Sequence, residues 1–148
     1  MASGAKIGNK TLFQREIPAG SGTYVTVAEV KELRGPSFSR DKLDATNFDS
    51  TDDYGEKLPG LKDGGEISAT LNFRPEHTSQ GMNTGLLKAF EDGTVENWRV
   101  QYPQFTNSPQ LIVRGFLTGW EVSATTKELM TVQIKLEVTG KPTPSNFA

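Results

Sequence analysis

The chain of 148 residues contains no cysteine, which excludes disulfide bridges, thiolate metal sites and cysteine nucleophiles. Apolar material is also scarce: 34% of the residues are hydrophobic, and no apolar run approaches the ~20 residues of a membrane-spanning helix. The first ten residues, MASGAKIGNK, lack the apolar run of a signal peptide. We therefore expect a soluble protein of intracellular origin, without membrane insertion and with a modest core.

The chain also lacks an excess of positive charge, since the net charge is −2. Proteins that bind nucleic acid generally are usually basic, because phosphate neutralisation supplies much of their affinity. The acids are unevenly distributed: residues 41–66 hold eight acids and three bases, a net charge of −5, whereas the remainder carries +3. The sequence thus predicts an acidic lobe on a mildly basic body.

The length predicts a single domain over residues 1–148. Residues 1–22 are rich in glycine with few apolar side chains, which favours an N-terminal arm with a short strand around residues 11–15. Such an arm can become ordered against a partner.

Residues 36–65 form a long loop in this interpretation. They include the stretch FDSTDDYGEKLPGLKDGG, which is acidic, rich in breakers and without core periodicity. A structureless loop of about 30 residues is unusual in a compact domain unless it has a function. Its scattered apolar side chains must be buried somewhere, so we expect another copy of the protein to cover the loop.

Strands are predicted by alternation of apolar and polar residues. Residues 66–74 and 130–139 alternate most clearly, residues 95–102 and 110–123 less so, and residues 23–33 predict a strand with a bulge. Gly115 and Gly119 suggest bends in the fourth of these segments. The proline-containing tail GKPTPSNFA is not expected to form a strand.

One helix is predicted over residues 79–92, with Met82, Leu86, Leu87 and Phe90 on its apolar face and Gly93 as its stop. The complete pattern is mainly β. An antiparallel β-sandwich or open barrel with one flanking α-helix fits best.

Known chemical motifs are missing. His77 is the only histidine and is interpreted as a surface-loop residue. Asp49, Thr51 and Asp53 match the first places of a calcium loop, but the glycine and glutamate that should follow are replaced by Tyr54 and Gly60. Paired acids in a flexible segment do not make a glycosidase site, and no phosphate-binding glycine motif occurs. Trp98 and Trp120 lie in predicted strands, which favours core or interface positions over ligand platforms. We therefore expect no enzyme, no metal and no cofactor.

The stretch ATNFDSTDDYGEKLPGLKDGGEISATLNF (residues 45–73) resembles the signature of the major tail tube proteins of long-tailed bacteriophages. Further pieces agree in order: TLFQRE, YVTVAEVKELRGPSFSRD, LLKAFEDGT and VQIKLEVTGKPT. The resemblance covers nearly the whole chain and is most specific in residues 45–73.

The resemblance implies a β-sandwich with one flanking helix, in which hexameric rings stack into a hollow tube. The double-stranded DNA and the tape-measure protein pass through that tube, and tail-end proteins are further implied partners. The implied location is the virion tail, assembled in the host bacterial cytoplasm.

The resemblance also implies two contacts between rings. The long loop would contribute side chains at six positions: Phe48, Asp49, Asp52, Asp53, Tyr54 and Leu58. The N-terminal arm would contribute Leu12, Phe13 and Arg15. A reading in which Phe48 or Tyr54 folds back onto its own chain stays open.

Three other functions stay open at this stage. The first is a related tube-fold protein of a tail completion complex, baseplate or injection machine. The second is a ligand-binding β-sandwich, supported by the two tryptophans, and the third is an enzyme with an unrecognised site.

Overall fold

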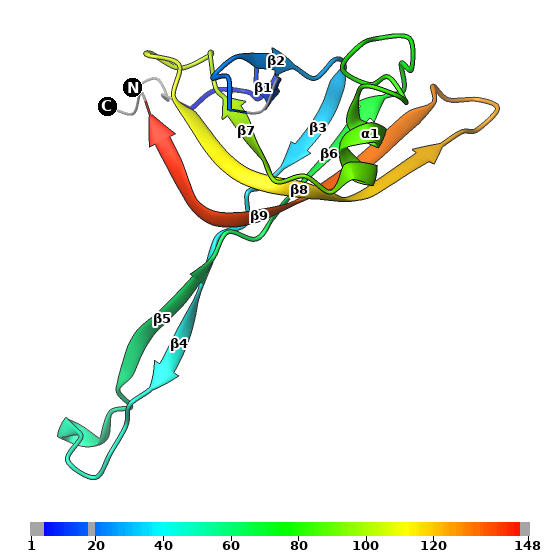
Figure 1. Cartoon of the computed structure of the whole chain (residues 1–148). Coiled ribbons are helices and arrows are strands. Elements are labelled where there is room, and N and C mark those ends of the chain that lie inside the picture. Colours follow the sequence, from blue (N-terminus) through cyan, green and yellow to red (C-terminus); the bar gives the residue numbers. More distant parts are fainter. Residues whose placement is uncertain (1–4, 18–19, 146–148) are drawn as a thin grey trace.

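The computed structural model describes residues 5–17 and 20–145, and Figure 1 shows its elements. These described residues form nine strands, one α-helix and one short turn of 3₁₀ type. In chain order they are β1 (Leu12–Glu16), β2 (Tyr24–Thr26), β3 (Val30–Arg34), β4 (Ser39–Asp44), η1 (Thr51–Asp53), β5 (Lys57–Asp63), β6 (Glu66–Asn72), α1 (Leu86–Asp92), β7 (Glu96–Gln101), β8 (Gln110–Ser123) and β9 (Thr131–Ser145).

Seven strands form one antiparallel sheet in the order β2-β1-β7-β8-β9-β6-β3, and β4 and β5 form a separate hairpin. β2 and β3 lie at opposite ends of the sheet although only residues 27–29 join them. So short a connection requires the sheet to roll up, and Figure 1 shows the resulting curvature. The predicted antiparallel β fold with one helix is confirmed, and the open barrel describes its shape.

The core fills the concave side of this rolled sheet. On β6 the predicted alternation holds, with Ile67, Ala69 and Leu71 buried. Trp98 of β7 is buried as predicted and stacks on Phe13 of β1, with ring centroids 5.4 Å apart. Burial of large apolar side chains of this kind stabilises a fold by about 1.5–3 kcal/mol each.

The helix is shorter than predicted, because α1 begins at Leu86 and residues 79–85 form turns. Gly85 accounts for the late start of the helix. A Cβ at this position would lie 2.5 Å from the Gly81 nitrogen, so the backbone at Gly85 packs directly against the backbone of the preceding turn. Gly93 ends the helix with φ 61°, as predicted. Met82 and Phe90, predicted on the buried face, are exposed instead.

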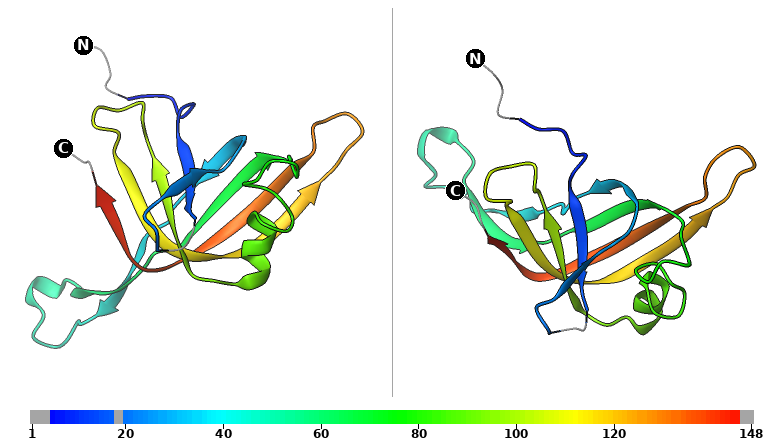
Figure 2. Two further views of the ribbon diagram at one scale, coloured as in Figure 1. Left: turned by 45° about the horizontal axis from the view of Figure 1, so that its top comes forward. Right: turned by 90° about the horizontal axis from the view of Figure 1, so that it is seen from above.

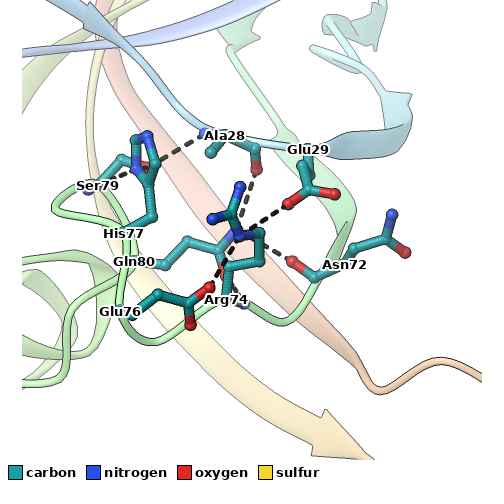
Figure 3. A network of polar contacts seen from close by, with 8 residues as sticks. All are labelled: Ala28, Glu29, Asn72, Arg74, Glu76, His77, Ser79 and Gln80. Atoms are coloured by element: carbon teal, nitrogen blue, oxygen red, sulfur yellow. Dashed lines mark hydrogen bonds and ion pairs between the residues drawn. The ribbon is translucent and has the colours of Figure 1, made fainter.

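The turn segment before α1 is held by polar contacts, which Figure 3 shows. The buried Gln80 side chain donates to the carbonyl oxygens of Ala28 at 2.9 Å and Asn72 at 3.0 Å, and accepts from the Arg74 N–H. The Ser79 hydroxyl oxygen accepts from the Ala28 N–H. These bonds connect the segment to the β2–β3 connection and to the end of β6, in place of the first turns of the predicted helix.

Two strand predictions are wrong in extent. Residues 23–33 form two strands, β2 and β3, because the chain crosses there from one end of the rolled sheet to the other. The tail was expected to be irregular, yet β9 continues to Ser145 and pairs with β8 there. Pro142 and Pro144 are tolerated because this part of β9 pairs with β8 but not with β6. Residues 146–148 of the tail lie outside the described residues.

The β8 prediction is confirmed over residues 110–123. Gly119 lies at a register shift between β8 and β9. At Gly115 the backbone of Glu137 is so close that a Cβ would collide with its carbonyl oxygen. Trp120 is partly buried and packs edge-on against Phe73, with centroids 6.2 Å apart.

Candidate functional site: a protruding acidic hairpin

The predicted loop of residues 36–65 is a β-hairpin, which corrects the expectation of an irregular segment. β4 and β5 pair antiparallel, with Leu43 opposite Leu58 and a register shift between Arg40 and Lys42. Figures 1 and 2 show this hairpin standing away from the rolled sheet. Both faces of the hairpin are exposed to solvent, so its strands do not need alternating apolar and polar residues. For that reason the sequence shows no strand periodicity in this segment.

The hairpin is not covered by its own chain. Every residue of β4 is exposed, and β5 is exposed except for one half-buried position. At the tip Phe48 is fully exposed and Tyr54 is 76% exposed, while Leu58 on the stem is 55% exposed. The reading in which Phe48 or Tyr54 folds back onto its own subunit is therefore wrong. An isolated two-stranded hairpin is only marginally stable in water.

Local polar bonds nevertheless order the tip. The Asn47 side-chain oxygen accepts from the Asp49 N–H at 2.8 Å, and the Ser50 hydroxyl accepts from the Asn47 N–H at 3.0 Å. The Thr46 hydroxyl accepts from the Glu56 N–H at 2.8 Å across the hairpin. The tip thus has a defined shape that presents its aromatic side chains to the outside.

Negative charge is concentrated at this tip. Residues 44–56 contain five acids and no base, whereas the stem carries the bases Arg40, Lys42, Lys57 and Lys62. Asp49, Asp52 and Asp53 make no ion pair with any residue that the structure describes. Hydrogen bonds from Thr46, first its side chain and then its backbone, lower the pKa of Asp44. The tip is therefore an anionic surface without a partner in its own chain.

Glycines at the base of the hairpin set its direction. Gly65 has φ 67°, and a Cβ there would collide with the Ser37 carbonyl oxygen. On the other strand, Gly35 has φ 99° and a Cβ would lie 2.5 Å from the Glu66 carbonyl oxygen. The two chain segments cross at this neck, residues 35–37 and 64–66, so closely that a side chain would not fit at Gly35 or Gly65.

The N-terminal residues proposed as an arm are largely part of the body. Leu12, Phe13 and Arg15 lie on β1, inside the sheet between β2 and β7. Phe13 is 1% exposed, so its predicted role in an intersubunit contact is wrong: it is a core residue of its own chain. Residues 5–10 remain exposed, whereas residues 1–4, 18 and 19 of the predicted arm lie outside the described residues.

Arg15 also has partners within its own chain. Its guanidinium forms two bonds to the Glu96 carboxylate, at 2.7 and 2.9 Å, and lies over the Trp98 ring. A third bond reaches the Gly85 carbonyl oxygen at 3.4 Å. The side chains of Arg15 and Glu96 are only 12% and 10% exposed. The sequence held no signal for this pair, because its members are 81 positions apart.

The other candidate groups do not form a site in the described residues. His77 lies in the segment before α1, where its Nδ1 accepts from the Ser79 N–H at 3.2 Å. No cluster of three or more histidine, aspartate or glutamate side chains that could hold a metal ion occurs among residues 5–17 and 20–145. Within the same residues, no helix has the length and apolar character to cross a lipid bilayer.

Comparison with known proteins gives one family. The family model described as lambda phage tail tube protein matches residues 8–145. No curated protein sequence matches the chain significantly.

Several solved structures share the fold. A chain from the tail of an empty gene transfer agent particle, solved with C6 symmetry, is 20% identical with a TM-score of 0.79, and the match covers 95% of this chain and 99% of that one. The SPP1 tail tube protein is 15% identical with a TM-score of 0.66, over 93% and 77%. The sheath/tube terminator of an extracellular contractile injection system is 10% identical with a TM-score of 0.71, over 98% and 99%.

Proposed function

Because the chain belongs to the lambda phage tail tube protein family, we propose that it forms hexameric rings that stack into the hollow tube of a phage tail. Its role is structural, with no catalysis and no cofactor. The fold shared with a gene transfer agent tail of C6 symmetry supports the six-fold ring.

The protruding hairpin is the observation that carries this proposal. Its apolar side chains Phe48, Tyr54 and Leu58 are exposed in the single chain. Full burial of such side chains is worth about 1.5–3 kcal/mol each. A docked hairpin would bury them against a copy in the adjacent ring, which supplies the support that its own chain does not.

Stacking in one direction follows from the shape of the contact. A hairpin and its receiving surface are different parts of the chain, so the contact is head to tail. Head-to-tail contacts leave a free hairpin at one end and a free receiving surface at the other, and they propagate into filaments. Rings joined in this way would give a tube of open length.

The partners that we propose for the tube are those of a conduit. Double-stranded DNA and the tape-measure protein pass through it, and tail-end proteins close it. The exposed polar side of β3, β6 and β9 carries both signs of charge, including Glu32, Arg34 and Lys135. A tube lumen with such a mixture of charges would not bind DNA through neutralisation of its phosphates.

Assembly would take place in the host bacterial cytoplasm and the product would reside in the virion tail.

Electron microscopy of the purified, concentrated protein tests the proposal. We expect hollow tubes whose cross-section has six-fold symmetry. A protein that stays monomeric at every concentration and salt, by light scattering and negative-stain microscopy, would contradict it.

A tube terminator is the second candidate function. The likeness to the terminator of an injection system, with a TM-score of 0.71, favours it. A terminator would form single rings that do not propagate, so the same micrographs separate the two functions.

A further inference from the structure

A crevice of about 380 Å³ opens at the seam where the rolled sheet does not close. It lies between the segment that precedes β1, the strand β3 and the residue that follows β7. Its lining residues are Gly8, Asn9, Thr11, Lys31, Leu33, Gly35 and Tyr102. No acid is among them, and no described element of the chain fills the crevice.

The crevice combines an apolar floor with a basic rim. Leu33 and Tyr102 are half-buried, and burial raises the pKa of the Tyr102 hydroxyl. Lys31 lines the crevice, and Lys6 and Lys10 belong to the exposed N-terminal segment that supplies the lining residues Gly8 and Asn9. Within residues 5–17 and 20–145 these lysine side chains make no ion pair or hydrogen bond with the rest of the chain.

The hairpin tip has the complementary chemistry. It presents the exposed aromatic rings of Phe48 and Tyr54 beside the unpaired carboxylates of Asp49, Asp52 and Asp53. We propose that the tip of one copy binds in this crevice of a second copy, with an aromatic ring toward Leu33 and Tyr102 and the acids beside the lysines. This inference rests on the tube proposed above and assigns the receiving surface of the contact between its rings.

The hairpin tip of a chain does not reach the crevice of the same chain. Gly35 lines the crevice and also belongs to the neck, and from the neck the strands β4 and β5 lead away. β5 has seven residues, which places the tip about 20 Å from the neck. Figures 1 and 2 show the hairpin leading away from the body, with the loop after β7 on the same lateral side.

Electrostatics would act mainly on orientation and rate. Pairs of exposed charges are worth about 0.2–1 kcal/mol each and are screened by salt. Their arrangement selects the register in which rings meet. The aromatic rings would contribute the larger share of the binding energy through burial.

Crosslinking tests the contact, and the natural absence of cysteine makes it specific. We pair Tyr54→Cys in the tip with Asn9→Cys at the crevice and treat assembled tubes with a short bismaleimide. A ladder of linked chains in denaturing gels is expected. The matched control pairs Tyr54→Cys with Glu128→Cys, an exposed residue in the turn between β8 and β9, and should give no ladder.

The outcomes separate the two proposals. Tubes that form but crosslink no more through position 9 than through position 128 would overturn the crevice and leave the tube intact. Tubes that never form, even from the unaltered chain, would overturn both. Crosslinking of the tip to a different protein, with copies unlinked, would also overturn the crevice assignment.

Exchange of the charges at positions 31 and 53 is a second test of the contact that needs no crosslink. Lys31→Glu or Asp53→Lys alone should raise the concentration needed for assembly by up to about fivefold. The double variant should recover part of this loss, and Lys127→Glu in the β8–β9 turn should change little. Equal effects at positions 31 and 127, without recovery in the double variant, would contradict the contact.

Discussion

At the scale of residues, the pair Arg15–Glu96 shows how two charged side chains are accommodated beside a small core. The two side chains are almost buried and form a bidentate pair that joins β1 to β7. Removal of one partner from such a pair leaves an uncompensated charge, which costs more than the intact pair contributes.

We predict that Glu96→Ala lowers the free energy of unfolding by about 3–5 kcal/mol. The control is Glu32→Ala, which removes the partner of Arg34 from an exposed pair and should cost less than about 1 kcal/mol. Urea denaturation followed by circular dichroism measures both. Equal losses would mean that Arg15 finds water or another partner when Glu96 is absent.

Two phenylalanines give a second contrast between residues. Phe13 is buried against Trp98, whereas Phe48 is fully exposed on the hairpin tip. We expect Phe13→Ala to cost about 3–5 kcal/mol of folding stability. Phe48→Ala should change stability by less than about 0.5 kcal/mol, as exposed substitutions usually do, and should impair assembly instead. Denaturation curves and light scattering of the same samples test this, and a large loss of stability at Phe48 would contradict the exposed position.

At the scale of elements, the hairpin depends on its neck for direction. The close approach at Gly65 leaves no room for a side chain, and its positive φ favours glycine independently. A substitution there acts on the hairpin's orientation as well as on local strain.

We predict that Gly65→Ala weakens assembly far more than Gly93→Ala does. Gly93 also has a positive φ of 61°, but a Cβ added there would meet open space, so its replacement measures the cost of the backbone conformation alone. That cost is roughly 1–2 kcal/mol. The readouts are the concentration at which tubes appear and the denaturation midpoint. Identical behaviour of the two variants would show that the neck does not orient the hairpin.

At the scale of the whole molecule, the body and the hairpin are separate in their energetics. The buried core draws its residues from the seven-stranded sheet, from α1 and from Val27, and none from β4 or β5. Folding of the body should therefore be independent of the hairpin, whereas assembly should require it.

Replacement of residues 40–62 by a short glycine-serine linker tests this division. We expect a folded monomer or isolated ring with native far-ultraviolet circular dichroism and cooperative unfolding, but no tubes. Size-exclusion chromatography with light scattering gives the mass. An unfolded product would show that the hairpin stabilises its own body, and tubes in its absence would remove the hairpin from the contact between rings.

Much of the fold was readable from the sequence because it follows from local alternation. The apolar residues of β6 recur every second position and face the core as predicted, and the same holds for Val132, Ile134 and Leu136 on β9. Such alternation depends only on which side of a strand is exposed to solvent. The acidic segment, too, was recognisable from composition as unsuited to burial in its own chain.

Contacts between distant parts of the chain were decided only in three dimensions. Phe13 was assigned to an arm because residues 1–22 are rich in glycine with few apolar side chains, but pairing of β1 with β7 buries it. The helix was predicted to begin at residue 79, because helix propensity contains no information about distant contacts. In the structure the Gln80 side chain instead donates hydrogen bonds to the carbonyl oxygens of Ala28 and Asn72. The hairpin was interpreted as irregular because a strand exposed on both faces has no apolar period.

The sequence by itself therefore determined the β class, the faces of the regular strands and the chemistry of the acidic segment, since each depends on neighbours along the chain. The tertiary structure alone decided that this segment is an ordered, outward-pointing hairpin and that a basic-rimmed crevice opens at the seam of the sheet. Both depend on how the sheet rolls up, and that curvature follows from strand pairings that join residues far apart in the chain.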